Sequence, residues 1–264
     1  FNDIKSGNID YQGNDLAHME GEALRQIRPD LQMIFQDPIS SLNPRRKIRD
    51  VISEGISVWG NTKGSWSQER IEELMVAVGI DPKFGERRPH QFSGGQCQRI
   101  GIARALALDP KVLICDEPVS ALDVSVQAQV LNILEDMKAR YGLTLLFISH
   151  DLSVVKNVSD RIIVMYLGKV CEIGNADELY ENPRHPYTRA LLASIPEPAP
   201  TVDVSEGDIE GELPSPIHPP AGCRFNTRCQ HATDICFTDE PVMQQVGDSD
   251  HYLACHHPVE VAVV

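Results

Sequence analysis

Short apolar runs alternate with amphipathic segments through most of the chain. Apolar runs of four residues are typical of buried strands, and apolar positions three or four residues apart are typical of helices. In chain order, the strand-like runs are 112–115, 145–148 and 162–165, and the helix-like segments are 96–108, 124–139 and 176–181. Strands that alternate with helices favour an α/β domain with a largely parallel sheet.

The composition changes after residue 195. Segment 196–220 contains seven prolines interleaved with Glu and Asp, which is typical of an extended linker. Residues 221–264 then form a short stretch that is rich in Cys and His. The sequence therefore predicts an α/β domain at 1–195, a linker at 196–220 and a Cys-rich C-terminal module at 221–264.

Charge and hydropathy narrow the classes of function. The net charge is −14, and residues 197–264 hold 12 acidic and 2 basic side chains. Proteins that bind duplex DNA usually present a basic face, so this balance argues against a nucleic-acid partner. No run approaches the roughly 18 apolar residues of a spanning helix, and the N-terminus has no basic-then-apolar leader. We expect a cytoplasmic protein.

Two adjacent carboxylates follow the first apolar run. Residues 112–115 lead directly into Asp116 and Glu117. A buried strand that ends there would place both acids at the carboxyl edge of a parallel sheet, where α/β proteins bind ligands. Asp116 then suits Mg²⁺, and Glu117 suits polarising a water that attacks a phosphate. A core strand followed by a solvated acidic turn is the alternative.

A glycine-rich helix start precedes this strand. Ser93 and Gln96 have the spacing of a capping box, and Gly94 and Gly95 leave the first amide groups of the helix unshielded. Those amides and the helix dipole would attract an anion such as a terminal phosphate. The alternative is an ordinary helix start with glycine as packing filler.

Two further polar residues follow apolar runs. His150 comes after 145–148, and an imidazole there can hydrogen-bond a γ-phosphate. Gln36 comes after the run 33–35, and its amide can accept from a metal-bound water and donate to a phosphate oxygen. Taken singly, a histidine after a strand is more often a surface or core residue.

The order of these motifs closely resembles the ATP-binding-cassette (ABC) family over residues 1–195. The resemblance implies a P-loop NTPase-like fold, with a RecA-like core plus a helical subdomain, that binds ATP and Mg²⁺. It implies catalytic roles for Glu117, His150 and Gln36. It also implies nucleotide contacts from the signature motif and the D-loop, at Ser93, Gly94, Gly95, Gln96 and Asp123, and Mg²⁺ ligands at Asp116 and Gln36.

One family motif does not occur in the sequence. The phosphate-binding string Gly-x-x-x-x-Gly-Lys followed by Ser or Thr is absent, and residues 60–65 have the wrong spacing. In relatives this string precedes a stretch that resembles residues 6–13. We expect the sequence to be a fragment of a longer ATPase that binds ATP poorly by itself. Because two cassettes pair head to tail in this family, it could still complete a partner's site with its signature motif.

Two longer strings resemble one branch of the family. Residues 35–45 and 182–192 are similar to segments of the oligopeptide and dipeptide importer ATPases. The resemblance implies an ATPase subunit at the inner face of the membrane, paired with a second ATPase subunit and two permease subunits, and indirectly with an extracytoplasmic peptide-binding protein. Residues 42–60 are the expected permease contact. The alternative is a non-catalytic partner cassette that supplies only the signature motif and has a metal-sensing tail.

Four of the seven cysteines lie in the C-terminal segment, at Cys223, Cys229, Cys236 and Cys255. Thiols in a reducing compartment favour metal over disulfides, although the spacing lacks the Cys-x2-Cys pair of most zinc sites. The resemblance adds an iron–sulfur cluster of the [4Fe-4S] type, reported in some relatives. A cluster, zinc and no metal all remain open, while Cys97, Cys115 and Cys171 are most simply buried apolar residues.

Overall fold

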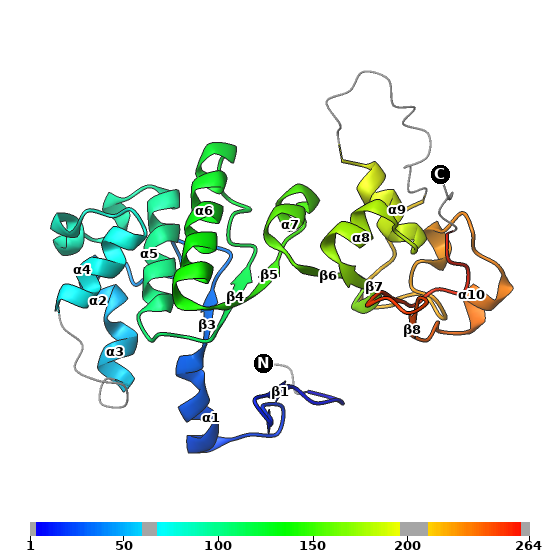
Figure 1. Ribbon diagram of the computed structural model, residues 1–264, viewed down its shortest axis with the longest axis horizontal. Coiled ribbons are helices and arrows are strands. Elements are labelled where there is room, and N and C mark those ends of the chain that lie inside the picture. The colour runs from blue at the N-terminus through cyan, green and yellow to red at the C-terminus, as the bar shows by residue number, and fades with distance from the viewer. Residues whose placement is uncertain (1–3, 60–67, 196–210, 260–264) are drawn as a thin grey trace. The chain divides into compact units, whose positions relative to one another are not determined.

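The computed structural model describes residues 4–59, 68–195 and 211–259 (Figure 1). The chain divides into two compact units, residues 1–150 and 151–264. Residues 196–210 of the predicted linker lie outside the described residues. The three-part division predicted from composition stays a prediction.

Among its described residues, unit 1 contains a two-stranded sheet, a three-stranded sheet and a group of helices. The antiparallel pair is β1 (Asp10–Tyr11) and β2 (Asn14–Asp15), and the three-stranded sheet consists of β3 (Leu31–Ile34), β4 (Val112–Asp116) and β5 (Thr144–Ile148). Its helices are α1 (Gly21–Ile27), η1 (Arg28–Asp30), α2 (Ile48–Ile52), α3 (Glu54–Trp59), α4 (Gln68–Ala77), η2 (Pro82–Glu86), η3 (Pro89–Gln91), α5 (Gly94–Leu106) and α6 (Val124–Tyr141). Strands β3, β4 and β5 are parallel neighbours in that order, as the sequence predicts for this part of the chain.

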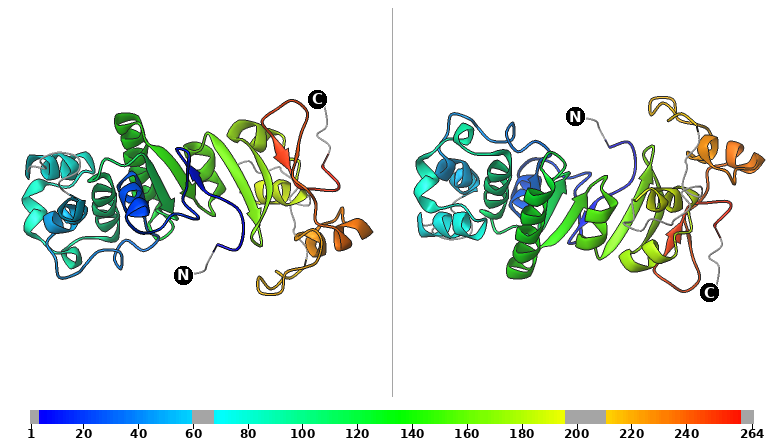
Figure 2. Two further views of the ribbon diagram at one scale, coloured as in Figure 1. Left: turned by 90° about the horizontal axis from the view of Figure 1, so that it is seen from below. Right: turned by 90° about the horizontal axis from the view of Figure 1, so that it is seen from above.

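The two long helices α5 and α6 are stabilised by capping residues at their ends and by buried apolar faces. Asp123 caps α6, whose C-terminal cap Gly142 has the left-handed φ of +62° that favours glycine. Ile100 and Ile102 of α5 and Leu134 of α6 are buried. The helices pack on each other, and α5 also packs on β3, next to the sheet in Figures 1 and 2. This packing fixes the starts of both helices relative to the sheet.

Helices α2, α3 and α4 and the short helix η2 form a group next to α5 (Figure 1). Helix α2 packs on α5, α3 and η2, and α4 packs on α5 and η2. Their shared core contains Ile48, Ile52, Leu74 and Met75, each at most 1% exposed. The arrangement matches the helical subdomain implied by the family resemblance.

Unit 2 is built on an antiparallel sheet. Its strands are β6 (Arg161–Tyr166), β7 (Lys169–Asn175), β8 (Gln244–Gln245) and β9 (Tyr252–Leu253), in the order β6-β7-β9-β8. Its helices are α7 (Leu152–Val158), α8 (Ala176–Glu181), α9 (Pro186–Ala193), η5 (Asn226–Arg228) and α10 (Asp234–Thr238).

The predicted strand at 162–165 is confirmed as β6, and its neighbour β7 runs antiparallel to it. Leu167 and Gly168 both have positive φ and join β6 directly to β7 as a hairpin. Two-residue hairpin loops with positive φ match the twist of antiparallel strands. Because β9 pairs with β7, the described part of the C-terminal segment shares a sheet with 161–175.

Candidate functional site

Three of the predicted site residues meet at one carboxylate. The Gln36 amide Nε2 donates to Glu117 Oε2 at 2.8 Å, and His150 Nδ1 lies 3.3 Å from Glu117 Oε1. The Glu117 side chain is 26% exposed and that of His150 is 72% exposed. The carboxylate is therefore held by two polar partners and stays open to water.

Parallel strand order explains why these residues meet. Gln36 follows β3, Glu117 follows β4 and His150 follows β5, and the carboxyl ends of parallel strands lie at one edge of a sheet. The Glu117 N–H donates to the Ile148 carbonyl at 3.0 Å, which fixes the chain as it leaves the sheet. Asp116 is the last residue of β4 at the same edge.

The backbone of Glu117 is strained. Its φ of +44° lies in the left-handed region, which costs a non-glycine residue about 1–2 kcal/mol. The neighbouring hydrogen bonds must therefore maintain this conformation, and residues held in such conformations cluster at functional sites. The sequence offers no signal for it, since a turn after a strand ordinarily favours Gly or Asn at such a position.

The surroundings of Glu117 favour its ionised form. The hydrogen bond from His150 is the largest cause that lowers the pKa of the carboxyl, and Ser120 and Gln36 act in the same direction. An ionised carboxylate with an amide and an imidazole at its oxygens can accept a proton from water and share polar contacts with a phosphate.

The predicted capping box at the start of α5 is confirmed. The Gln96 N–H donates to Ser93 Oγ at 3.3 Å, and the Ser93 N–H donates to Gln96 Oε1 at 2.9 Å. A Cβ at Gly95 would lie 2.3 Å from Val126 Cγ1, whereas one at Gly94 would have Leu122 Cδ2 as its nearest atom, at 3.9 Å. Gly95 is therefore required by the close approach of α6.

Asp123 lies at the start of α6. Its Oδ1 accepts from the Val126 N–H at 3.0 Å and from Ser125 Oγ at 2.7 Å, and the Ser125 bond is the largest cause that lowers the pKa of the carboxyl. Gln127 donates to the Val119 and Leu122 carbonyls, which holds the preceding loop. Val126 therefore contacts Asp123 of the D-loop through its N–H and lies against Gly95 of the signature motif through its side chain. These contacts fix the two motifs relative to each other.

The four C-terminal cysteines share one neighbourhood in unit 2. Burial raises the pKa of Cys223, Cys229 and Cys255, the last to about 12, and the negative charges of other tail thiolates act in the same direction on each. All four are free thiols. In the part of the chain that the structure describes, no group of three or more His, Cys, Asp or Glu side chains is arranged to hold a metal. The described geometry therefore gives no support to an iron–sulfur cluster or a zinc ion at these cysteines.

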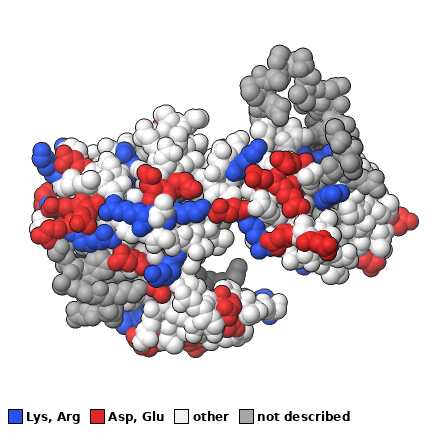
Figure 3. All heavy atoms as spheres, viewed as in Figure 1, with Lys and Arg blue, Asp and Glu red and all other residues white. Residues whose placement is uncertain are grey.

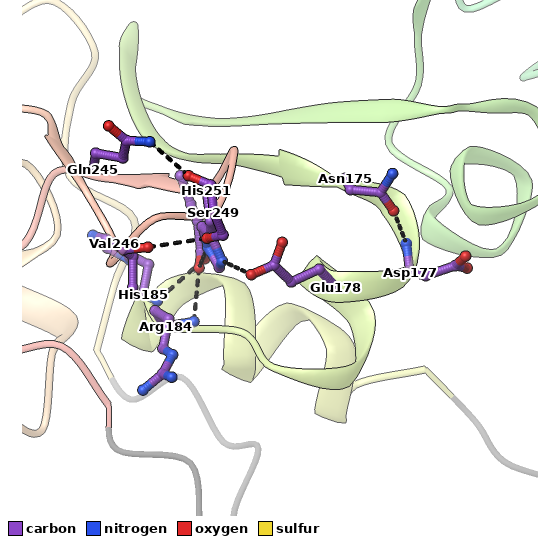
Figure 4. A network of polar contacts seen from close by, with 10 residues as sticks. Asn175, Asp177, Glu178, Arg184, His185, Gln245, Val246, Ser249 and His251 are labelled. Atoms are coloured by element: carbon purple, nitrogen blue, oxygen red, sulfur yellow. Dashed lines mark hydrogen bonds and ion pairs between the residues drawn. The ribbon is translucent and has the colours of Figure 1, made fainter.

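A second carboxylate site, in unit 2, does not follow from the sequence (Figure 4). Glu172 is completely buried, and its carboxylate accepts from the Arg184 N–H at 2.7 Å and the His185 N–H at 3.1 Å. His251 Nε2 lies 2.7 Å from Glu172 Oε1. His185 caps α9 through its Nδ1, which accepts from the Tyr187 N–H at 3.0 Å. These contacts give residues 184–187 of the importer-like string a structural role.

The surface agrees with the composition. On the face shown in Figure 3, basic side chains are bordered by acidic ones. Among the ion pairs of unit 1, Glu86 pairs with both Lys47 and Arg49. None of the helices described is long and apolar enough to cross a membrane.

Parallel strands that are followed by Gln36, Glu117 and His150, together with a capped Ser-Gly-Gly-Gln helix, are typical of an ATP-binding cassette. Family models agree: the ABC transporter model matches residues 2–120, and the model of the oligopeptide/dipeptide transporter C-terminal region matches 171–236.

Individual proteins narrow the assignment further. The chain is 50% identical over 252 residues to the oligopeptide transport ATP-binding protein OppF of Salmonella typhimurium, covering 94% of this chain and 75% of that protein. It is 50% identical to AppF of Bacillus subtilis, an oligopeptide transport ATP-binding protein, covering 95% and 77%. The chain therefore belongs to the ABC transporter ATP-binding protein family.

Solved structures share the fold. CbiO1 from Clostridium perfringens, part of the ABC transporter complex cbiONQ, superposes with a TM-score of 0.58 at 27% identity, covering 67% of this chain and 68% of that chain. The ATP-binding cassette MJ0796, in a dimeric post-hydrolysis state bound to ADP and Pi, gives 0.57 at 26% identity, covering 65% and 74%. The predicted cassette fold is confirmed.

Proposed function

We propose that this chain is the ATP-hydrolysing subunit of an importer of oligopeptides or dipeptides. The observation that carries the proposal is the contact of Gln36 and His150 with Glu117 at the edge of a cassette sheet. The oligopeptide transport relatives and the matching C-terminal model support the substrate class.

In this proposal Glu117 is the general base for the attacking water, and His150 and Gln36 contact the γ-phosphate. Asp116 and Gln36 would hold Mg²⁺, which neutralises phosphate charge when bound. Ser93, Gly94, Gly95 and Gln96 would contact the nucleotide of a partner cassette, together with Asp123. The amides at the start of α5 support this role, because a helix N-terminus favours an anion.

The proposed partners are a second ATPase subunit and two permease subunits, with an extracytoplasmic peptide-binding protein acting indirectly and no nucleic acid. The chain would lie at the cytoplasmic face of the membrane. Residues 42–60 are the proposed permease contact, of which 42–59 are described. In support, the helical subdomain has a cavity of about 360 Å³ whose lining includes Arg49, Asp50, Ile56, Ile71, Glu72 and Met75. A lining that combines apolar and charged side chains suits a short amphipathic helix.

Reconstitution tests the proposal. The full-length form of the chain, assembled with its permeases and partner cassette in vesicles, should give peptide uptake that requires ATP and stops when Glu117 is replaced by Gln. Uptake that persists in Glu117→Gln, but is lost when Ser93 is replaced by Arg, would instead support a non-catalytic subunit that contributes only its signature motif. Uptake unaffected by both variants would contradict both functions.

For the C-terminal cysteines we propose no step that depends on a metal. An iron–sulfur cluster in this segment rests on the family resemblance alone. Anaerobic purification followed by iron, sulfide and zinc analysis tests it: about four irons per chain would support the cluster, and metal-free protein with an intact unit 2 would remove it.

A further inference from the structure

Arg104 of α5 contacts both sides of the segment that presents Gln36. Its Nη1 donates to the Ser41 carbonyl at 2.5 Å, and its guanidinium carbon lies over the Phe35 ring, 5.9 Å from the centroid. Phe35 precedes Gln36 directly, and Ser41 closes the turn that follows it. One side chain thus contacts the chain before and after the glutamine.

The turn after Gln36 is closed by its own hydrogen bonds. Asp37 Oδ1 accepts from the Ile39 N–H at 2.9 Å and the Ser40 N–H at 3.2 Å, and the Ser41 N–H donates to the Asp37 carbonyl at 3.2 Å. Ser41 Oγ donates to the Pro38 carbonyl at 3.0 Å. These hydrogen bonds make the turn rigid, so a contact that fixes Ser41 also restricts the position of Gln36.

The environment of Arg104 favours a fixed geometry. The residue is half-buried, and burial lowers its pKa while the charge of Glu54 acts in the opposite direction. A guanidinium remains charged at neutral pH, so its partial desolvation must be offset by directed contacts. The carbonyl of Ser41 and the ring of Phe35 supply two such contacts.

We propose that Arg104 is a positioning residue that couples the signature helix α5 to the Gln36–Glu117 contact. Helix α5 presents Ser93 to Gln96 at its first turn and Arg104 in its last. A displacement of the helix would therefore move the turn at 37–41 and change how Gln36 meets Glu117. The proposed role in turnover rests on the proposed function, whereas the anchoring of the turn does not.

Amide hydrogen exchange tests the anchoring without any need for ATPase activity. In Arg104→Met, which keeps an apolar stem of similar shape, exchange at the amides of 39–42 should accelerate by about tenfold or more, because hydrogen bonds from charged groups are among the stronger ones. Arg104→Lys, whose ammonium can still donate to the Ser41 carbonyl, should restore much of the protection. Arg99→Met is the matched control, since Arg99 Nη1 donates from the same helix to the Gly79 carbonyl instead, at 3.5 Å.

Turnover of the transporter assembled with the full-length form of this chain provides the second readout. Arg104→Met should lower kcat for ATP more than it changes KM, with partial recovery in Arg104→Lys. Native exchange at 39–42 in Arg104→Met would overturn the proposal, as would equal acceleration in Arg99→Met, because either result removes the specific anchor. Absence of turnover in the unmodified complex would reject the proposed function, and the exchange comparison would still decide whether Arg104 anchors the turn.

Discussion

The two units each pair a glutamate with a histidine, and burial gives the two pairs opposite properties. Glu117 and His150 have side chains that are 26% and 72% exposed, whereas those of Glu172 and His251 are 0% and 1% exposed. An exposed pair contributes little to stability and can rearrange around a ligand. Removing one partner of a buried pair lowers the stability of the fold strongly, because the remaining polar groups stay desolvated. The difference in burial favours a catalytic role for the first pair and a stabilising role for the second.

The largest effect is expected at Glu172. Replacing it by Ala leaves the N–H groups of Arg184 and His185 and the ring of His251 without their acceptor, so unit 2 should lose about 3–5 kcal/mol of unfolding free energy. Glu178→Ala is the control, because Glu178 lies 3.4 Å from the same ring but is 36% exposed, and should cost at most about 1 kcal/mol. Urea unfolding of both variants checks this, and equal losses would show that burial does not distinguish them.

Acidification should weaken the buried region next. Burial lowers the pKa of His185 from 6.5 to about 4. The unfolded chain therefore binds a proton at a pH where the folded chain does not, and stability is full above about pH 6.5 and falls toward pH 4. Since each pKa unit corresponds to about 1.4 kcal/mol, the expected loss is about 3 kcal/mol.

His185→Asn separates this effect from general acid denaturation. An asparagine oxygen can still accept from the Tyr187 N–H and cap α9, but it does not titrate in this range. Between pH 4 and pH 7, the unfolding free energy of this variant should change less with pH than that of the unmodified chain. An unchanged pH dependence would assign the acid sensitivity to other groups.

A smaller effect is expected where α5 approaches α6. Gly95→Ala forces its new methyl group against Val126 and should cost about 1–3 kcal/mol, whereas Gly94→Ala has room and should be neutral or stabilising. The double variant Gly95→Ala with Val126→Ala should recover part of the loss. Thermal unfolding measures all three, and equal effects of the two glycine variants would contradict the close packing.

The smallest effect concerns the ionisation of Glu117. Its pKa is lowered chiefly by the hydrogen bond with His150, so the carboxylate stays ionised further into the acid range. His150→Ala should raise that pKa toward its ordinary value and move the acid limb of the ATPase profile to higher pH. A carboxyl titration followed by NMR gives the direction, and an unshifted or lowered pKa would show that His150 does not act on this carboxyl.

The sequence predicts much of unit 1 because its signals are local. Apolar runs that end in Asp116, His150 or Gln36, and the Ser93–Gln96 spacing, each specify a strand end or a helix start. The buried Glu172 could not be found in this way, because its partners His185 and His251 come from distant segments. The hairpin at Leu167 and Gly168 was missed since its first residue is a leucine, which is rare at positive φ.

The measurement that bears most directly on this comparison is single-site turnover by the transporter assembled with the full-length form of this chain, carrying Glu117→Gln. The glutamine keeps the size of the side chain but cannot act as a base, so ATP should still bind while hydrolysis falls by about 10²–10⁴-fold. Unit 2 should unfold as in the unmodified chain. Hydrolysis within a few-fold of the unmodified complex would contradict the assignment of Glu117 as the catalytic carboxylate.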